Sequence, residues 1–416
     1  MTLPRFLQIH TLTPYAAALL NRDDVGRAKR LPFGGVNRTR VSSQCLKRHW
    51  RTAVGDWSLD GLGAPMSVRS RQTFVQQIAQ PLRAEGFADD AILAVVEAFQ
   101  AVLLGESAKA KAEKAKGKDA KDKEAGKDAE ADRDPLADLK TGQVLVLGHP
   151  EVEFIRSQAR ALLQSATTPK DARKAVEALF KDKETLANFK ALRLACGLDA
   201  ALFGRMVTSD ILARGDAAVH VAHSFTVHGE DSEPEFFTAV DDLEKAAGEL
   251  GSGMMGDSEL TSGLFYGYVV IDLPLLLSNL EGVPAREWEQ ADRTLALGVV
   301  ERLIRLIASV SPGAKLGSTA PYAYAHTVLV ELGDRQPRTL ANAFLKPVRV
   351  ATGDDLAATA NARLSEYLTR FDAMYGAGEQ RLIASLEPVT DLPATRTAGL
   401  ADLTGRITAA LGGASS

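Results

Sequence analysis

RFLQIHTLTPYAAALLNRDDVGRAKRLPFGGVNRTRVSSQCLKRHWRTAV, residues 5–54, predicts a strand, a polar loop and a helix in succession. The opening RFLQIHTL alternates well enough for a strand, and a polar loop containing PFGG follows. A helix is predicted from Ser42, because four apolar residues then share one face: Leu46, Trp50, Ala53 and Val54. This stretch therefore begins a domain that mixes strands with helices.

The same stretch concentrates positive charge. Residues 1–51 hold ten Lys or Arg residues and only two acidic ones, Asp23 and Asp24, although the whole chain has a formal net charge of −4. A basic segment on a mildly acidic body is typical of a site for a polyanion such as a nucleic acid.

The basic side chains fall into a pattern that suits a phosphate backbone. Ser42 and Ser43 stand where a helix N-cap is expected, so free N–H groups and the positive end of the helix dipole can face a phosphate. Five further side chains could follow that backbone from the helix or the preceding loop: Arg22, Lys29, Gln44, Lys47 and Arg51. The plainer interpretation is a solvated basic helix on an ordinary surface.

Beyond residue 54 the pattern first predicts helices and then alternates. Residues 106–134 contain no apolar side chain larger than Ala and hold nine basic and nine acidic residues, which predicts a disordered or solvated helical segment. Strands are predicted at 199–207, 217–228, 261–273 and 324–332. Helices are predicted at 354–375 and around six buried residues, Trp288, Leu295, Val299, Leu303, Ile304 and Ile307. The predicted class is therefore α+β, with a helical insertion at 55–195.

Two more segments could meet nucleic acid. Arg205 could contact phosphate and Met206 could press against a base, although a Met at a strand end usually belongs to the core. The adjacent aromatics Phe236 and Phe237, followed by Thr238, could insert into a base stack, although such residues equally often anchor a loop locally.

Catalytic patterns are weaker. On a strand, a spacing of three places His220 and His223 on opposite faces, and no third metal ligand accompanies His220 and His228. The pairs Asp23–Asp24 and Asp241–Asp242 could supply carboxylates to a metal, but adjacent aspartates more often cap turns. No phosphate-binding loop, nucleophile elbow or zinc-protease motif occurs. The chain is therefore expected to be no enzyme and to need no cofactor or metal.

The remaining composition bears on location. Cys45 and Cys196 are the only cysteines and are far apart, which favours a reducing cytoplasm over a disulfide framework. The N-terminus lacks the pattern of a secretory signal, and no stretch is long and apolar enough for a membrane helix. A cytoplasmic protein without a membrane partner is expected.

Several sequence blocks resemble one family, the CasC (Cas-seven) backbone subunits of the type I-E CRISPR Cascade complex. The longest is LNRDDVGRAKRLPFGGVNRTRVSSQCLKRHWR, at residues 20–51. Further blocks follow in the family's order: ALFGRMVTSD at 201–210, EFFTAVDDLE at 235–244, TSGLFYGY at 261–268, PGAK at 312–315 and LANAF at 340–344.

The resemblance implies a hand-like fold. An RRM-like (ferredoxin-like) palm at 1–54 and 196–416 would carry a helical fingers insertion at 55–195 and an extended thumb loop at 229–260. Copies would stack helically along a CRISPR guide RNA and display it for pairing with target DNA. Other Cascade subunits would complete the complex, and a recruited helicase-nuclease would destroy the target.

Residue roles carry over by motif. Lys29, Ser42, Gln44, Lys47 and Arg51 match palm positions that hold RNA, and Arg22, Arg48 and Arg205 join this predicted RNA-binding set. Met206 matches the residue against the displaced nucleotide, and Phe236, Phe237 and Thr238 match the thumb tip. The chain departs from the family at Phe236, where Trp is expected, and in the charged segment 106–134.

A DNA-contacting helix is predicted after Thr168 and Pro169, which suit an N-cap and a first helical residue. Its basic side would comprise Lys170, Arg173, Lys174 and Lys181, similar to a lysine-bearing fingers helix of the family. A solvated helix face is the plainer interpretation. Two alternatives to the scaffold remain: a metal-dependent RNA endonuclease cutting through a loop aspartate, Asp210 or Asp241, and a structural polymer with incidental RNA affinity.

Overall fold

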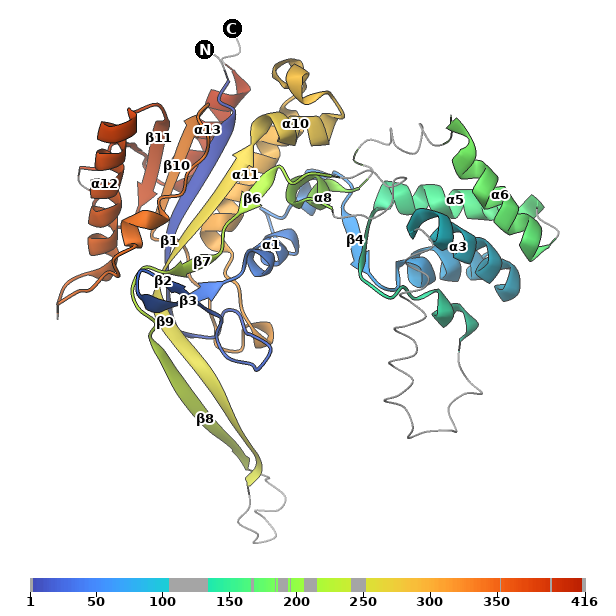
Figure 1. Ribbon diagram of the computed structural model, residues 1–416, viewed down its shortest axis with the longest axis horizontal. Coiled ribbons are helices and arrows are strands. Elements are labelled where there is room, and N and C mark those ends of the chain that lie inside the picture. The colour runs from blue at the N-terminus through green and yellow to red at the C-terminus, as the bar shows by residue number, and fades with distance from the viewer. Residues whose placement is uncertain are drawn as a thin grey trace. The chain divides into compact units, whose positions relative to one another are not determined.

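The computed structural model (Figure 1) describes residues 3–104, 134–165, 168–183, 185, 194, 196–205, 215–240, 252–351, 353–389 and 391–413. The chain forms two compact units. The first comprises Met1–Leu62, Val219–Pro274 and Arg293–Ser416. The second comprises Gly63–Ala218 and Leu275–Asp292.

A mixed sheet forms the centre of the first unit. Its strand order is β12-β11-β10-β1-β9-β7-β3-β2. The bounds are β1 Phe6–Ala18, β2 Arg30–Phe33, β3 Val36–Val41, β6 Val219–Val221, β7 Ser224–Thr226, β9 Ser252–Asp272, β10 Thr327–Gly333, β11 Gln380–Ser385 and β12 Thr395–Arg396. In Figure 1, β1 lies between β9 and β10, and both neighbours are antiparallel to it.

The four central strands of the sheet follow the ferredoxin-like topology. In chain order, β1 leads to α1 (Ser43–Arg51), then β6 and β7, then β9, then α11 (Thr294–Ser309), then β10. The spatial order β10-β1-β9-β7 is thus fourth, first, third, second, with every neighbouring pair antiparallel. This is the β-α-β-β-α-β arrangement. The predicted α+β class with an RRM-like palm is confirmed.

Helices cover both faces of the sheet. Phe265 and Tyr266 are neighbours in β9 and therefore point to opposite faces. Phe265 packs with Cys45 and Leu46 of α1, whereas Tyr266 packs in a cluster with Leu364 of α12 (Leu356–Tyr375). The unit also contains η1 Asp60–Leu62, η5 Lys315–Gly317, η6 Ala341–Phe344 and α13 Leu400–Gly412.

Because helices cover both faces of the sheet, a network of charged side chains is buried on the face that α12 covers. His10 Nε2 lies 3.0 Å from Glu331 Oε2, and its Nδ1 lies 2.9 Å from the Tyr266 hydroxyl. Arg381 Nε donates to Glu331 Oε1 at 2.7 Å. Burial alone would raise the pKa of Glu331, but hydrogen bonds from Arg338 and His10 hold it well below its ordinary value. The carboxylate therefore stays ionised inside the protein.

A two-stranded ribbon continues from this sheet. β8 (Ser232–Val240) pairs with the first half of β9 from Ser232↔Thr261 to Val240↔Ser252. Figure 1 shows this ribbon extending from the end of β7 and the sheet-bound half of β9. Its described part falls in the segment predicted as the thumb at 229–260.

The second unit is mainly helical. A small antiparallel sheet joins β4 (Ser67–Ser70) to β5 (Leu145–Gly148). The helices are η2 Phe74–Ala79, α2 Gln80–Ala84, α3 Asp89–Leu104, η3 Pro135–Leu139, α5 His149–Ser165, α6 Pro169–Lys181, α8 Leu198–Phe203, the part of α10 (Leu273–Glu281) from Leu275, and η4 Ala285–Gln290. Its limits differ from the predicted insertion at 55–195, and 106–133 lie outside the described residues.

Three predicted elements are wrong in detail. Residues 198–203 form helix α8 rather than a strand, because a short apolar run fits either structure and Gly197 and Gly204 bracket it with positive φ angles of 86° and 81°. Helix α1 ends at Arg51, which leaves Val54 exposed instead of buried. Trp288 belongs to η4, not to α11.

Candidate nucleic-acid interface

The N-terminus of α1 is capped as predicted. Ser42 Oγ accepts a hydrogen bond from Cys45 N at 3.3 Å. Two neighbouring N–H groups already have partners: Ser42 N donates to Asn21 Oδ1 and Ser43 N donates to His223 Nδ1, both at 3.0 Å. The N–H groups of Ser42, Ser43 and Cys45 are therefore already bonded and are not free for a phosphate.

The loop before β2 brings cations beside α1. Lys29 N donates to Asn21 O at 3.0 Å, and Arg40 N donates to Lys29 O at 2.8 Å, so the loop is fixed along β3. Burial raises the pKa of the Cys45 thiol, and Lys29 and Arg48 oppose that shift. Their electrostatic effect on one sulfur atom shows that the loop and the helix contribute to the same positive region.

His223 completes this region. Burial lowers the pKa of its imidazole, and the positive charges of Arg40 and Lys29 lower it further. Because Nδ1 accepts from Ser43 N, the neutral ring carries its proton on Nε2. We call the region formed by Arg22, Lys29, Arg40, Gln44, Lys47, Arg48, Arg51 and His223 the loop–helix surface.

The predicted members of this surface are accessible to different degrees. Arg22, Gln44 and Arg48 are exposed. Lys29, Lys47 and Arg51 are half-buried, and Ser42 is buried as the cap. Arg40 and His223 were missed from sequence, because only the pairing of β3 with β7 brings the two residues beside α1. No local pattern signals such a contact.

Two of the ten N-terminal basic residues serve the fold instead. Arg38 is fully buried and donates to the carbonyls of Phe33 at 3.1 Å, Thr226 at 3.0 Å and Phe344 at 2.9 Å. Arg30 forms ion pairs with Glu230 and Glu259 at the base of the β8–β9 ribbon. Counting charges in the sequence therefore overstates the positive charge available to a ligand.

The ribbon exposes one aromatic residue among several acidic residues. Phe236 is 67% exposed and lies opposite Asp257. Phe237 and Thr238 lie in β8, but their side chains fall outside the described residues. The described ribbon segments 229–240 and 252–262 contain six acidic residues and no Lys or Arg. Contact with nucleic acid there would rest on aromatic packing, not on cations.

Arg205 requires a correction. Its guanidinium is buried in the second unit, and Nη1 lies 2.5 Å from Glu151 Oε2, which is also buried. Paired and enclosed in this way, Arg205 cannot contact a phosphate at the surface. Met206 lies outside the described residues.

Helix α6 starts where the sequence predicts. Thr168 Oγ1 accepts from Asp171 N at 3.2 Å, and Pro169 is the first helical residue. Arg173, Lys174 and Lys181 are exposed, with Arg173 Nε 3.5 Å from Glu177 Oε1. The side chain of Lys170 is outside the described residues. An exposed basic face is present, and contact with DNA stays a prediction.

The carboxylates and histidines do not form a metal site within the described residues. Asp23 Oδ1 accepts from Val25 N at 3.1 Å and from Arg27 N at 2.8 Å, so Asp23 caps a turn. His228 Nδ1 lies 2.6 Å from Gly229 O. Asp210, Asp241 and Asp242 fall outside the described residues.

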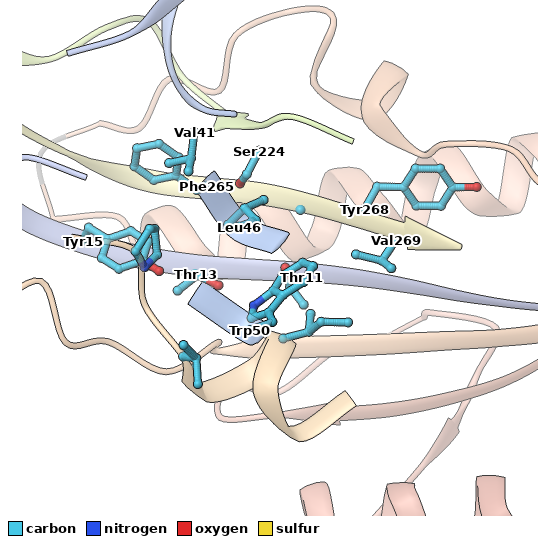
Figure 2. A pocket seen from close by; sticks show the side chains of 14 residues that line it. Thr11, Thr13, Tyr15, Val41, Leu46, Trp50, Ser224, Phe265, Tyr268 and Val269 are labelled. Carbon is cyan, nitrogen blue, oxygen red and sulfur yellow. The ribbon is translucent and has the colours of Figure 1, made fainter. Parts of the chain in front are cut away.

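A cavity of about 40 Å³ lies between the sheet and helices α1 and α11. Figure 2 shows Thr11, Tyr15 and Trp50 around it. The buried Trp50 Nε1 has no hydrogen-bond partner among the described residues. This volume suits a few water molecules at most, so the cavity is too small for a nucleotide.

In the described part of the chain, no helix combines the length and apolar content needed to cross a membrane.

A ferredoxin-like sheet with a long β-ribbon beside a positive loop–helix surface defines an RRM-like protein. The family model of the CT1975-like protein matches residues 7–409, and the chain belongs to this family. No curated protein sequence matches the chain.

Two of the solved structures with similar chains are described by the complexes that they belong to. One belongs to a CRISPR RNA-guided surveillance complex in a pre-nicking state, with a TM-score of 0.73 and 26% identity, covering 98% of this chain and 100% of that chain. The other belongs to a CRISPR RNA-guided surveillance complex, with a TM-score of 0.64 and 22% identity, covering 97% and 99%. The second likeness concerns the fold alone. The predicted resemblance to chains of such complexes is confirmed at the level of family and fold.

Proposed function

We propose that this protein is the CasC (Cas-seven) backbone subunit of a type I-E CRISPR Cascade complex. In this proposal several copies bind one guide RNA along its length and display its bases for pairing with target DNA in antiviral defence. The observation that carries the proposal is the loop–helix surface, in a chain that is similar over its full length to a chain of an RNA-guided surveillance complex.

The chemistry of the surface supports backbone binding. Its cations come from a loop fixed along β3 and from one face of α1, so their spacing is set by the fold. Contacts with phosphates position a nucleic acid without reading its sequence. Base pairing would then supply sequence recognition, as in other RNA-guided complexes.

The proposed self-assembly uses two unlike surfaces. The acidic ribbon with Phe236 and the positive loop–helix surface are different parts of one chain, so contact between them in successive copies is head-to-tail and can repeat along an RNA. Other Cascade subunits and a recruited helicase-nuclease complete the proposed set of partners, in the cytoplasm. The chain itself is proposed to be no enzyme and to use no cofactor.

The decisive experiment is to purify the protein and sequence the RNA that accompanies it. Guides of uniform length flanked by repeat sequence are expected. A preparation without nucleic acid would contradict the proposal.

The double variant Lys47→Glu/Arg51→Glu tests the surface itself. We expect it to abolish RNA co-purification, because charge reversal one turn apart on α1 repels the phosphates. A matched control is Arg370→Glu/Arg396→Glu, which changes the charge equally at exposed sites on α12 and β12. Circular dichroism checks that both variants fold. Equal RNA occupancy in the two variants would exclude the loop–helix surface as the anchor.

The alternative is a metal-dependent RNA endonuclease. Such an enzyme needs carboxylates that converge on a metal, and Asp23 is already used as a turn cap. Replacing Asp23, Asp24, Asp210, Asp241 and Asp242 by Asn in turn should leave a bound complementary RNA equally intact in Mg²⁺. Cleavage by the wild type that one of these changes stops would establish the enzyme instead.

A further inference from the structure

The loop of residues 310–326, which joins α11 to β10, borders the loop–helix surface. Ala314 N donates to Leu19 O at 2.9 Å, and Leu19 N donates to Thr319 Oγ1 at 3.3 Å. Gly313 N donates to Nε2 of His49, in the last turn of α1, at 3.4 Å. The 310–326 loop is thus hydrogen-bonded to Leu19, shortly before the loop that carries Lys29, and to His49 of α1.

The loop also has a defined internal structure. Ser311 Oγ donates to Ala323 O at 2.8 Å and accepts from Ala323 N at 3.0 Å. Gly317 adopts a φ of +76°, and a Cβ added there would lie 3.0 Å from the Tyr322 hydroxyl oxygen. The absence of a side chain at Gly317 lets the Tyr322 ring lie close to the turn. The two hydrogen bonds between Ser311 and Ala323, together with this close approach, fix the backbone from which the side chains of Tyr322 and Tyr324 extend.

Two tyrosines project from this fixed segment. Tyr322 is 77% exposed and Tyr324 is 71% exposed, one on each side of the anchored Ala323. Single exposed aromatics are ordinary on protein surfaces. Two of them on a bonded loop beside a positive surface match the composition of single-strand binding sites, in which cations follow the backbone and aromatic rings stack on bases.

We propose that Tyr322 and Tyr324 form a stacking site for bases of single-stranded RNA held by the loop–helix surface. This inference rests on the proposed RNA binding and adds a second kind of contact to it. The cations of the loop–helix surface would hold phosphates, and the tyrosine rings at the edge of that surface would stack on bases. A ring has no preference for one base, so the site would bind any sequence, as a guide-RNA subunit must.

The test is a double-mutant cycle between rings and bases. The full-length protein is titrated with a fluorescent single-stranded RNA and with the same RNA made abasic at successive positions. Wild type, Tyr322→Ala/Tyr324→Ala and the ring-preserving Tyr322→Phe/Tyr324→Phe are compared. Tyr375→Ala is the control, because Tyr375 is also exposed but lies at the end of α12.

We expect the alanine pair to bind intact RNA roughly 5- to 150-fold more weakly for each base that stacks. Removing the stacked base should weaken the wild type and the phenylalanine pair, and should not weaken the alanine pair further. The dependence of affinity on salt should be unchanged, since no cation is removed. The control should bind as the wild type does.

The outcomes separate this inference from the proposed function. If the wild type binds RNA and the alanine pair binds equally well, the stacking site is wrong and the RNA-binding function stands. If the alanine pair binds short RNA normally but no longer forms multi-copy assemblies, the tyrosines contact a second copy and the stacking site is again wrong. If the wild type binds no RNA, the proposed function itself falls.

Discussion

At the scale of single residues, the partner of each arginine decides its role. Arg48 is exposed on α1, Arg30 is divided between two carboxylates, and Arg38 is enclosed among carbonyl groups. The sequence presents all three as equivalent positive charges in one basic stretch. Only the geometry separates the residue that can hold a ligand from those that hold the fold.

Replacing Arg38 with Met should therefore reduce stability strongly. The buried carbonyls of Thr226 and Phe344 and the half-buried carbonyl of Phe33 would lose this donor, and each unsatisfied buried group costs about 1–3 kcal/mol. We expect the free energy of unfolding in urea to fall by roughly 3 kcal/mol or more, with Arg48→Met as the control within about 0.5 kcal/mol of the wild type. Equal stability of the two variants would show that the carbonyls find other partners.

His10 predicts how stability depends on pH. Burial lowers the pKa of its imidazole in the folded protein, although the hydrogen bond to Glu331 opposes this shift and Arg338 and Arg381 add to it. The unfolded chain then binds a proton more readily, from about pH 6.5 downward. Stability should fall as the pH drops through 6.5 toward the folded pKa, and be fully present above 6.5.

The measurement compares wild type with His10→Gln by thermal unfolding between pH 5 and 8. The variant removes this one titration while the other histidines remain, so its stability should fall less steeply below pH 6.5. Parallel curves would show that His10 does not contribute. Tyr266, which also faces His10, stays neutral throughout, because burial raises the pKa of its phenol far above this range.

At the scale of elements, the ribbon is held at its base. Arg30 pairs with Glu230 before β8 and with Glu259 in β9, and Glu259 also accepts from Ala28 N at 2.7 Å. Arg30 is 30% exposed and both carboxylates are less so. These contacts link the ribbon to the loop that carries Lys29, so they set the direction of the ribbon relative to the loop–helix surface.

Arg30→Met should loosen this link without unfolding the sheet. We expect hydrogen exchange of the amides of β8 to quicken by about tenfold, as for the removal of one partly buried ion pair. Exchange in β10 serves as the internal reference. The charge-swapped pair Arg30→Glu/Glu259→Arg should recover part of the protection. Unchanged exchange in β8 would show that strand pairing alone orients the ribbon.

Local signals account for the elements that were predicted correctly. Ser42 before α1 and Thr168–Pro169 before α6 mark helix starts within a few residues of sequence, and short runs rich in apolar residues mark β1 and β10. The misplaced features depend on distant contacts. The helix at 198–203 is held by its flanking glycines and by a hydrogen bond from Ser67 N to Asp199 Oδ1 at 2.8 Å. Arg205 is buried in an ion pair with Glu151, more than fifty residues away in the sequence. Neither contact can be inferred from periodicity.

At the scale of the whole molecule, the two units carry separate basic surfaces, one beside α1 and one on α6. We predict that neutralising Lys170, Arg173 and Lys174 together weakens binding of duplex DNA by the assembled complex and leaves guide RNA in place. The slope of the logarithm of affinity against the logarithm of salt concentration should also become shallower, by about 0.9 for each DNA phosphate that these side chains no longer neutralise.

The measurement is a titration of duplex DNA at several salt concentrations, with the RNA content of each preparation determined beside it. Arg286→Gln, an exposed arginine in the same unit, is the control. Loss of guide RNA from the triple variant would show that α6 belongs to the RNA surface instead.

One strand belongs to both the sheet and the ribbon. β9 runs from Ser252 to Asp272, and its second half lies against β1 in the middle of the sheet. A load applied to the ribbon along this strand acts on a whole row of hydrogen bonds at once, as shear, and cannot open them one after another as in a zipper. In a filament joined through such ribbons, every joint would transmit tension into the core of its subunit. Resistance to pulling would then be a property of each protein copy as well as of the nucleic acid that threads them.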